Sequence, residues 1–272
     1  MKTVTIKNKT GRLRSLMFVP AVEKMLKKIS SYNADAYIID LEDSIVKADK
    51  SAALIRCVSA LNEMVSTNKI FVRLNKNLAE LEVNKLKMFR ELGFMLPKFE
   101  SVDDYAAIRN ELREHYTIAL VETPKAMVNI SSIAMCENVD AIAFGAEDYT
   151  ASVNMKNDDA YLNGIKTLMI ANAKAFNKKV FDTPSFNISN QEEFQNEVDN
   201  SVALGFDGKL LIHPKHIEYI NNSFGYTDIN YLRKVVDAFE NSGEAVLVYD
   251  GKVYERMHIT RFKRIIKENG GF

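Results

Sequence analysis

The sequence predicts a single (β/α)₈ TIM barrel of the α/β class, because short apolar runs rich in β-branched residues alternate with longer segments of helical periodicity. Eight such runs occur, and eight βα units are the number that closes a parallel barrel. The expected strands are residues 16–20, 36–41, 70–75, 94–99, 117–122, 141–148, 179–184 and 209–214. An open doubly wound sheet is the rival, but it usually has fewer strands and a glycine-rich first turn, which this sequence lacks.

The segments between the runs are long enough for one crossover helix each. The expected helices cover residues 22–31, 50–67, 79–92, 102–114, 163–177 and 191–204. We therefore expect residues 1–220 to form the barrel. Residues 221–272 contain two more helical stretches, 229–242 and 260–268, but are too few for a separate domain. They are expected to form a short helical C-terminal arm or lid that belongs to the same domain.

The charge balance argues against several classes of partner. Lysine plus arginine and aspartate plus glutamate both number 36, so no net charge attracts nucleic acid or an anionic membrane. No segment carries the roughly 18 uninterrupted apolar residues of a membrane span, and the N-terminus has no signal-peptide run. Cys57 and Cys136 lack metal-binding spacing and are interpreted as reduced thiols. We expect a cytoplasmic protein with a small-molecule partner.

Polar residues gather where the predicted strands end. Active sites of (β/α)₈ barrels are built at the carboxyl ends of the strands, so these residues are the candidates for chemistry. In chain order they are Asp40, Glu42, Asp43, Arg73, Asn75, Lys98, Glu100, Glu122, Glu147, Asp148, Asp182 and His213. We expect them to converge on one rim of the barrel.

So many carboxylates around one mouth repel each other unless they share a cation. Glu122 and Asp148 end neighbouring predicted strands, so both can reach one ion, with Arg73 nearby. Oxygen ligands without histidine or cysteine favour a hard ion, Mg²⁺ or Mn²⁺, which takes one or two carboxylates and leaves its other positions to water and substrate. The alternative is that some of these acids only cap helices or pair with Arg73 and Lys98.

At these same residues the sequence resembles the citrate lyase β-subunit-like family of the HpcH/HpaI aldolase superfamily. The resemblance runs from Arg14 to about Ile220, through RSLMFVPA, DAYIIDLEDSIV, VRLN, LPKFES, ALVETPKAMVNI, AIAFGAEDYTASV and DGKLLIHPKHI. It implies a lyase that cleaves or forms a 3-hydroxyacyl-CoA thioester of the citryl-CoA or malyl-CoA type, with an oxo acid and an acyl-CoA as the other partners. By position, Glu122 and Asp148 match the metal ligands of that family.

The resemblance also implies roles for other residues. Arg73 matches the arginine that contacts the oxo acid, and Glu42 with Asp43 match the acidic pair after the second strand. Arg14 and Lys98 match basic positions that help bind the CoA phosphates. A homo-oligomer, a trimer or hexamer, is expected from the family.

One position departs from the pattern of the family. In the C-terminal stretch GKVYERM, Glu255 stands where several members place an acid/base aspartate that reaches a neighbouring subunit. The extra methylene moves the carboxyl group by about an ångström, and a shift of that size can change rates strongly. The substrate range is therefore expected to differ.

Other functions fit the same residues. A pyruvate-type aldolase or an acyl-CoA thioesterase would use Glu122, Asp148 and Arg73 in the same way. A further alternative is a non-catalytic subunit of a larger complex, which the altered C-terminal position favours and the intact metal and arginine positions oppose.

Overall fold

The computed structural model describes residues 12–64, 69–225 and 229–268. Within them, eight parallel strands close into a barrel in chain order, each hydrogen-bonded to its sequence neighbours and the last to the first. The strands are β1 (Ser15–Pro20), β2 (Ala36–Asp40), β3 (Ile70–Arg73), β4 (Gly93–Leu96), β5 (Thr117–Val121), β6 (Ala141–Phe144), β7 (Lys179–Asp182) and β8 (Gly208–Leu211). The predicted TIM barrel is confirmed, with one strand within or overlapping each predicted run.

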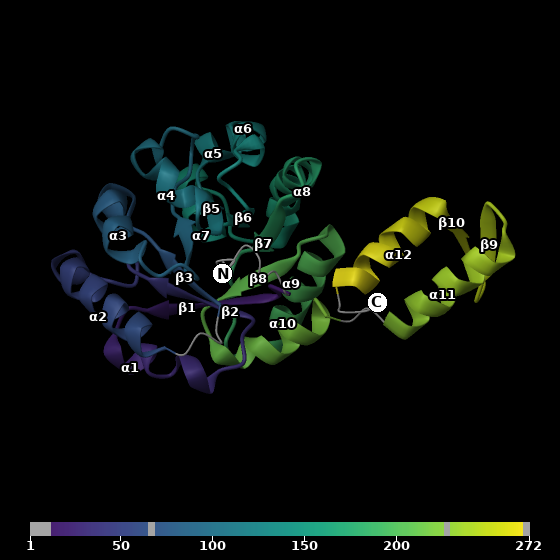
Figure 1. Cartoon of the computed structure of the whole chain (residues 1–272), viewed down its shortest axis with the longest axis horizontal. Coiled ribbons are helices and arrows are strands. Elements are labelled where there is room, and N and C mark those ends of the chain that lie inside the picture. The colour runs from purple at the N-terminus through teal and green to yellow at the C-terminus, as the bar shows by residue number, and fades with distance from the viewer. Residues whose placement is uncertain (1–11, 65–68, 226–228, 269–272) are drawn as a thin grey trace. The chain divides into compact units, whose positions relative to one another are not determined.

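Helices form an outer layer around the barrel (Figure 1). They are α1 (Glu23–Leu26), α2 (Lys50–Glu63), α3 (Ala79–Leu86), α4 (Arg109–Arg113), α5 (Pro124–Val128), α6 (Ile130–Met135), α7 (Ala146–Val153), α8 (Asp159–Ala175), α9 (Gln191–Leu204) and α10 (Ile217–Ser223). Local signals explain several starts. Thr123 caps α5, because its hydroxyl accepts a hydrogen bond from the Ala126 amide and Pro124 follows as the first helical residue. Asn190 caps α9, because its side chain accepts a hydrogen bond from the Glu193 amide.

The strands alternate between two apolar cores, as the two-residue period of a strand requires. In β2, Ala36 and Ile38 face the barrel interior, where they pack with Phe71. Tyr37 and Ile39 belong to the larger core between the barrel and the helices. Because both faces are buried, the strands are mostly apolar, and charged residues such as Asp40 and Arg73 stand at their carboxyl ends.

The chain divides into two compact units, residues 1–224 and residues 225–272. The second unit contains α11 (Ile229–Ser242), β9 (Val246–Tyr249), β10 (Lys252–Glu255) and α12 (Arg256–Glu268). Its small core includes Val235, Tyr254 and Ile266. The predicted function of this segment as an arm or lid stays a prediction.

The antiparallel hairpin β9–β10 was not expected from the sequence. Its turn residues Asp250 and Gly251 both have positive φ, 50° and 72°, as a type I′ turn requires. The Asp-Gly dipeptide between two short apolar runs is the sequence signal that predicts such a hairpin. Over the described part of the chain, no helix is long and apolar enough to cross a membrane.

Candidate active site

A pocket of about 400 Å³ opens at the carboxyl ends of the barrel strands. This is the end at which enzymes of this architecture place their chemistry. Its lining includes most of the acids predicted from the strand ends, together with several apolar side chains. The predicted site residues that line it are Asp43, Arg73, Glu122 and Asp148, and Asp40 joins them.

Arg73 is held rigidly at the end of β3 by Asp40 at the end of β2. The two residues are paired in the strand register, so their side chains leave the barrel side by side. Arg73 Nε and Nη2 each donate to an Asp40 carboxylate oxygen at 2.7 Å. Burial alone would raise the pKa of Asp40, but the charge and hydrogen bonds of Arg73 hold that pKa below the ordinary aspartate value. In the same way, burial alone would lower the pKa of Arg73, but Asp40 raises the pKa of Arg73 above its ordinary value. A two-point pair of this kind fixes the plane of the guanidinium.

The predicted acidic pair lies beside this guanidinium. Arg73 Nη1 is 2.9 Å from Asp43 Oδ2 and 3.2 Å from Glu42 Oε2. The Glu42 oxygen is buried, and despite that distance it has no hydrogen-bond partner of acceptable geometry in the structure. Burial raises the pKa of Glu42 to about 7, against the opposing charge of Arg73. Glu42 can therefore exchange a proton near neutral pH.

Glu122 follows β5 and is oriented by the backbone of Lys98. Lys98 adopts a left-handed conformation, with φ of 47°, and its amide donates to Glu122 Oε1 at 2.8 Å. Glu122 is 3% exposed. Burial raises its pKa to about 8, and the neighbouring carboxylates of Glu42 and Asp148 add to the rise. A buried acid surrounded by other acids needs a cation to remain ionised.

Asp148 reaches the pocket from a helix and not from a strand end, which corrects the prediction that a strand covers residues 141–148. Strand β6 stops at Phe144, and Asp148 lies in the first turn of α7. The amide of Ala146, the first residue of α7, donates to the Thr183 hydroxyl at 3.2 Å, which ties this turn to the end of β7. Lys98 Nζ lies 3.8 Å from Asp148 Oδ2.

Gly145 connects β6 to α7 and leaves room for the Glu122 carboxylate. A Cβ atom at Gly145 would lie 2.6 Å from Glu122 Cβ and 2.7 Å from Glu122 Oε2. Any side chain there must displace Glu122, so we expect Gly145→Ala to weaken Mg²⁺ binding by about tenfold or more.

Isothermal titration with Mg²⁺ measures this effect. Gly164→Ala, in the middle of α8, is the matched control, because an added Cβ there meets nothing within 4 Å. That variant should bind Mg²⁺ normally and be slightly more stable. Equal affinities for the two alanine variants would contradict the assignment of Glu122 as a ligand.

The residues present fit a hard divalent ion. Glu122 and Asp148 converge on the pocket. Among the described residues, no basic side chain forms a hydrogen bond or ion pair with the buried carboxyl of Glu122, whose pKa burial raises to about 8. Among those residues, no group of three or more histidine, cysteine, aspartate or glutamate side chains is arranged to hold a metal. An ion here would take two carboxylates and complete its shell with water and substrate, as Mg²⁺ commonly does.

Several polar residues predicted to share the rim are used structurally instead. Asp182 is fully buried on the helix side of β7, where Lys209 Nζ lies 2.8 Å and Lys166 Nζ 3.0 Å from its carboxylate. Asn75 donates to Glu82 at 2.6 Å, and Glu100 accepts from the Thr123 hydroxyl at 2.9 Å. The expectation that all of these polar residues converge on one rim therefore overstates the number of acids that reach the pocket.

Arg14 is a predicted site residue that lies away from the pocket, whereas Glu42 and Lys98 contact residues that line it. Arg14 precedes β1, at the amino end of the barrel, and binds both carboxylate oxygens of Asp35 at 2.8 and 2.7 Å and the Asn221 carbonyl at 2.9 Å. Glu255 is exposed on β10 in the second unit, where its amide donates to His258 Nδ1. The role of Glu255 stays a prediction.

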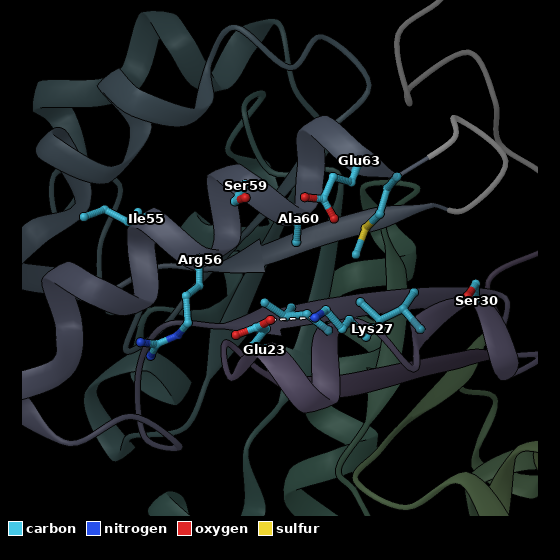
Figure 2. A pocket seen from close by; sticks show the side chains of 11 residues that line it. Glu23, Lys27, Ser30, Ile55, Arg56, Ser59, Ala60 and Glu63 are labelled. Carbon is cyan, nitrogen blue, oxygen red and sulfur yellow. Dashed lines mark hydrogen bonds and ion pairs between the residues drawn. The ribbon is translucent and has the colours of Figure 1, made fainter.

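A larger hollow of about 880 Å³ lies between α1 and α2. Figure 2 shows that its charged side chains are spread along the two helices and do not converge on one point. Glu23 and Lys27 pair with each other at 2.5 Å, and Arg56 pairs with Asp49 at the same distance. This hollow lacks the convergent polar groups of a reaction site.

Comparison with known proteins identifies the family. The profile of the HpcH/HpaI aldolase/citrate lyase family matches residues 14–214. Citrate lyase subunit beta of Leuconostoc mesenteroides subsp. cremoris is 29% identical over 93% of this chain and 92% of its own length, and (3S)-malyl-CoA thioesterase of Cereibacter sphaeroides is 26% identical over 93% of both. A solved citrate lyase beta subunit of M. tuberculosis, complexed with oxaloacetate and magnesium, is 26% identical over 79% of this chain and 98% of its own, with a TM-score of 0.66. This chain is therefore a member of the HpcH/HpaI aldolase/citrate lyase family.

Proposed function

We propose that this protein is a magnesium-dependent carbon–carbon lyase that cleaves or forms a 3-hydroxyacyl-CoA thioester. The observation that carries the proposal is the pocket in which the rigid Arg73–Asp40 pair stands beside the carboxylates of Glu122 and Asp148. Membership of a family of aldolases and lyases, and the magnesium and oxaloacetate bound by the M. tuberculosis relative, support it.

Glu122 and Asp148 would hold Mg²⁺, or Mn²⁺, at the mouth of the barrel. When bound, the ion supplies a Lewis acid that stabilises negative charge on the oxygen of the oxo acid. The Lys98 amide orients Glu122, and the Lys98 ammonium is placed beside Asp148. We therefore assign Lys98 to the organisation of the carboxylates and leave Arg14, at the other end of the barrel, out of the site.

In the cleavage direction, the hydroxyl proton of the substrate passes to a base as the carbon–carbon bond breaks. The electron pair of that bond goes to the α-carbon of the thioester, which takes up a proton, so the products are a 2-oxo acid and an acyl-CoA. Arg73 stabilises charge on the emerging oxo acid, because Asp40 fixes its donors before substrate binds. Glu42 and Asp43 are the acids placed next to it for proton exchange, and Glu255 is the further acid/base candidate.

A thioesterase is the second candidate, because a curated relative of similar identity is a (3S)-malyl-CoA thioesterase. Hydrolysis leaves the carbon skeleton intact and releases a hydroxy acid, whereas cleavage releases a 2-oxo acid. Product analysis by mass spectrometry after incubation with malyl-CoA separates the two reactions.

Isothermal titration calorimetry tests the metal dependence that both reactions require. We expect pyruvate, glyoxylate or oxaloacetate to bind when Mg²⁺ is present and to lose at least tenfold in affinity after EDTA treatment, since the ion supplies part of the oxo-acid site. Binding of the oxo acid with equal affinity without metal would refute the proposed site.

The assembly and the location of the protein are finer parts of the proposal. We propose a homo-oligomer, a trimer or hexamer, working in the cytoplasm on an oxo acid and an acyl-CoA. Light scattering on the purified chain measures the first of these, and a monomeric mass would contradict it.

A further inference from the structure

The pocket at the carboxyl ends of the strands has a charged side and an apolar side. The charged residues come from β2, β3 and the segments after β5 and β6. They are Asp40, Asp43, Arg73, Glu122, Glu147 and Asp148. Among the described residues that line the pocket, Arg73 is the one cation against five carboxyl groups, and it is already paired with Asp40 and Asp43. Lys98 Nζ, 3.8 Å from Asp148 Oδ2, and a bound divalent ion would together offset only part of this negative charge.

The apolar side comes from β1, β7 and β8, which are neighbours in the closed barrel. Its residues are Phe18, Pro20, Pro184, Phe186, Leu210 and Ile212, and Leu120, Phe144 and Ala146 add apolar surface beside the charged residues. Phe186 is 55% exposed and Ile212 37% exposed, so both present bare apolar surface to a ligand. A methyl or short alkyl group is stabilised by covering such surface, whereas a carboxylate loses hydration there without gaining a partner.

We propose that the oxo acid handled by this pocket is a 2-oxo monocarboxylate with a small apolar substituent, such as pyruvate, and not a dicarboxylate such as oxaloacetate. The inference rests on the proposed function and names the substrate class of the same site. One carboxylate of the oxo acid is matched by Arg73 and the ion. A second carboxylate would face either the acids of the charged side or the apolar wall, and both positions disfavour it.

Two CoA esters form a matched pair for the test. Citramalyl-CoA and citryl-CoA both release acetyl-CoA, and they differ at the hydroxyl-bearing carbon, which carries a methyl group in the first and a carboxymethyl group in the second. We expect kcat/KM to be at least about tenfold higher for citramalyl-CoA. In calorimetry with Mg²⁺ present, pyruvate should bind at least about tenfold more tightly than oxaloacetate.

A charge added to the apolar side should shift this preference. Phe186→Arg places a cation on the pocket wall and is expected to reduce the citramalyl-CoA preference by about tenfold. Ile188→Arg is the control, because Ile188 is 47% exposed on the same loop but does not line the pocket. That variant should keep the preference of the unchanged protein.

The outcomes separate this inference from the proposed function. Cleavage of both esters with equal kcat/KM, or a preference for citryl-CoA, would overturn the inference and leave the lyase assignment intact. If neither ester is cleaved, the lyase assignment fails, and the calorimetric comparison alone decides. Oxaloacetate binding as tightly as pyruvate would then reject the monocarboxylate preference, and tighter pyruvate binding would support it.

Discussion

Glu122→Gln is expected to lower kcat/KM for CoA-ester cleavage by roughly 10³-fold, because it removes one of two carboxylate ligands and with it most of the affinity for Mg²⁺. The variant should fold normally. Burial raises the pKa of Glu122 to about 8, so the site already tolerates a neutral side chain of this shape. The Lys98 amide can still donate to the glutamine oxygen. Steady-state rates, a Mg²⁺ titration by calorimetry and a thermal melt measure the three effects.

Glu100→Gln is the matched control for the change of charge. Glu100 follows the neighbouring strand β4 and accepts from the Thr123 hydroxyl, but it does not line the pocket. Its variant should keep kcat/KM within about threefold, as expected of a change away from the reacting groups. If Glu122→Gln also stayed within threefold and bound Mg²⁺ with unchanged affinity, Glu122 would not be a metal ligand.

Asp182→Asn is expected to lower the free energy of unfolding by about 3–5 kcal/mol, because it leaves two buried ammonium groups without their shared carboxylate. Asp182 is fully buried, and Lys166 and Lys209 are each 1% exposed. The Ser201 hydroxyl also donates to Asp182, at 2.6 Å. Urea denaturation monitored by circular dichroism measures the loss.

The pH dependence of stability follows from the same cluster. Burial would raise the pKa of Asp182, but the charges of Lys209 and Lys166 hold it well below the ordinary aspartate value. For an acid with a depressed pKa, the stabilisation is present above the unfolded-state pKa and is lost only as the pH falls through the folded-state value. The contribution of Asp182 should therefore persist through mildly acidic pH.

Asp159→Asn is the comparison for this cluster. Asp159 binds Lys166 at 2.7 Å, but its side chain is 28% exposed, so water can replace part of its interaction. We expect it to cost about 1 kcal/mol, far less than Asp182→Asn. Equal losses for the two variants would show that Asp182 does not carry the charge balance of this cluster.

The barrel could be predicted from the sequence because strands buried on both faces must be continuously apolar. Each predicted run matches a strand to within a few residues, and the differences lie mainly at the carboxyl ends. The run 141–148 shows why. Strand β6 ends at Phe144 and α7 begins at Ala146, with only Gly145 between them, and hydrophobicity does not mark this boundary because Ala146 is also buried. The Asp-Gly dipeptide at residues 250–251 was a local signal for the hairpin, but an interpretation based on apolar periodicity alone does not use it.

Residue types at strand ends indicated the site only in part. Asp182 ends a strand just as Glu122 follows one, yet Asp182 faces the helices and Glu122 faces the pocket. Likewise, Arg14 and Lys98 are both basic residues within the stretches that resemble the family, but they lie at opposite ends of the barrel. No local pattern distinguishes these cases, since the pairing of Asp182 with Lys166 and Lys209 spans three separate elements.

The sequence by itself determined the barrel, the family and the group of acids from which the site is drawn, because these depend on periodicity and residue order along one chain. Tertiary structure decided which acids reach the pocket, the pairing of Arg73 with Asp40, the amide of Lys98 on Glu122 and the division of the pocket into charged and apolar sides. Those features depend on side chains from distant strands meeting at one end of the barrel. Burial raises the pKa of Glu42 and Glu122, whereas paired cations hold the pKa of the buried Asp40 and Asp182 low, so the cation beside each buried acid decides whether it keeps its charge.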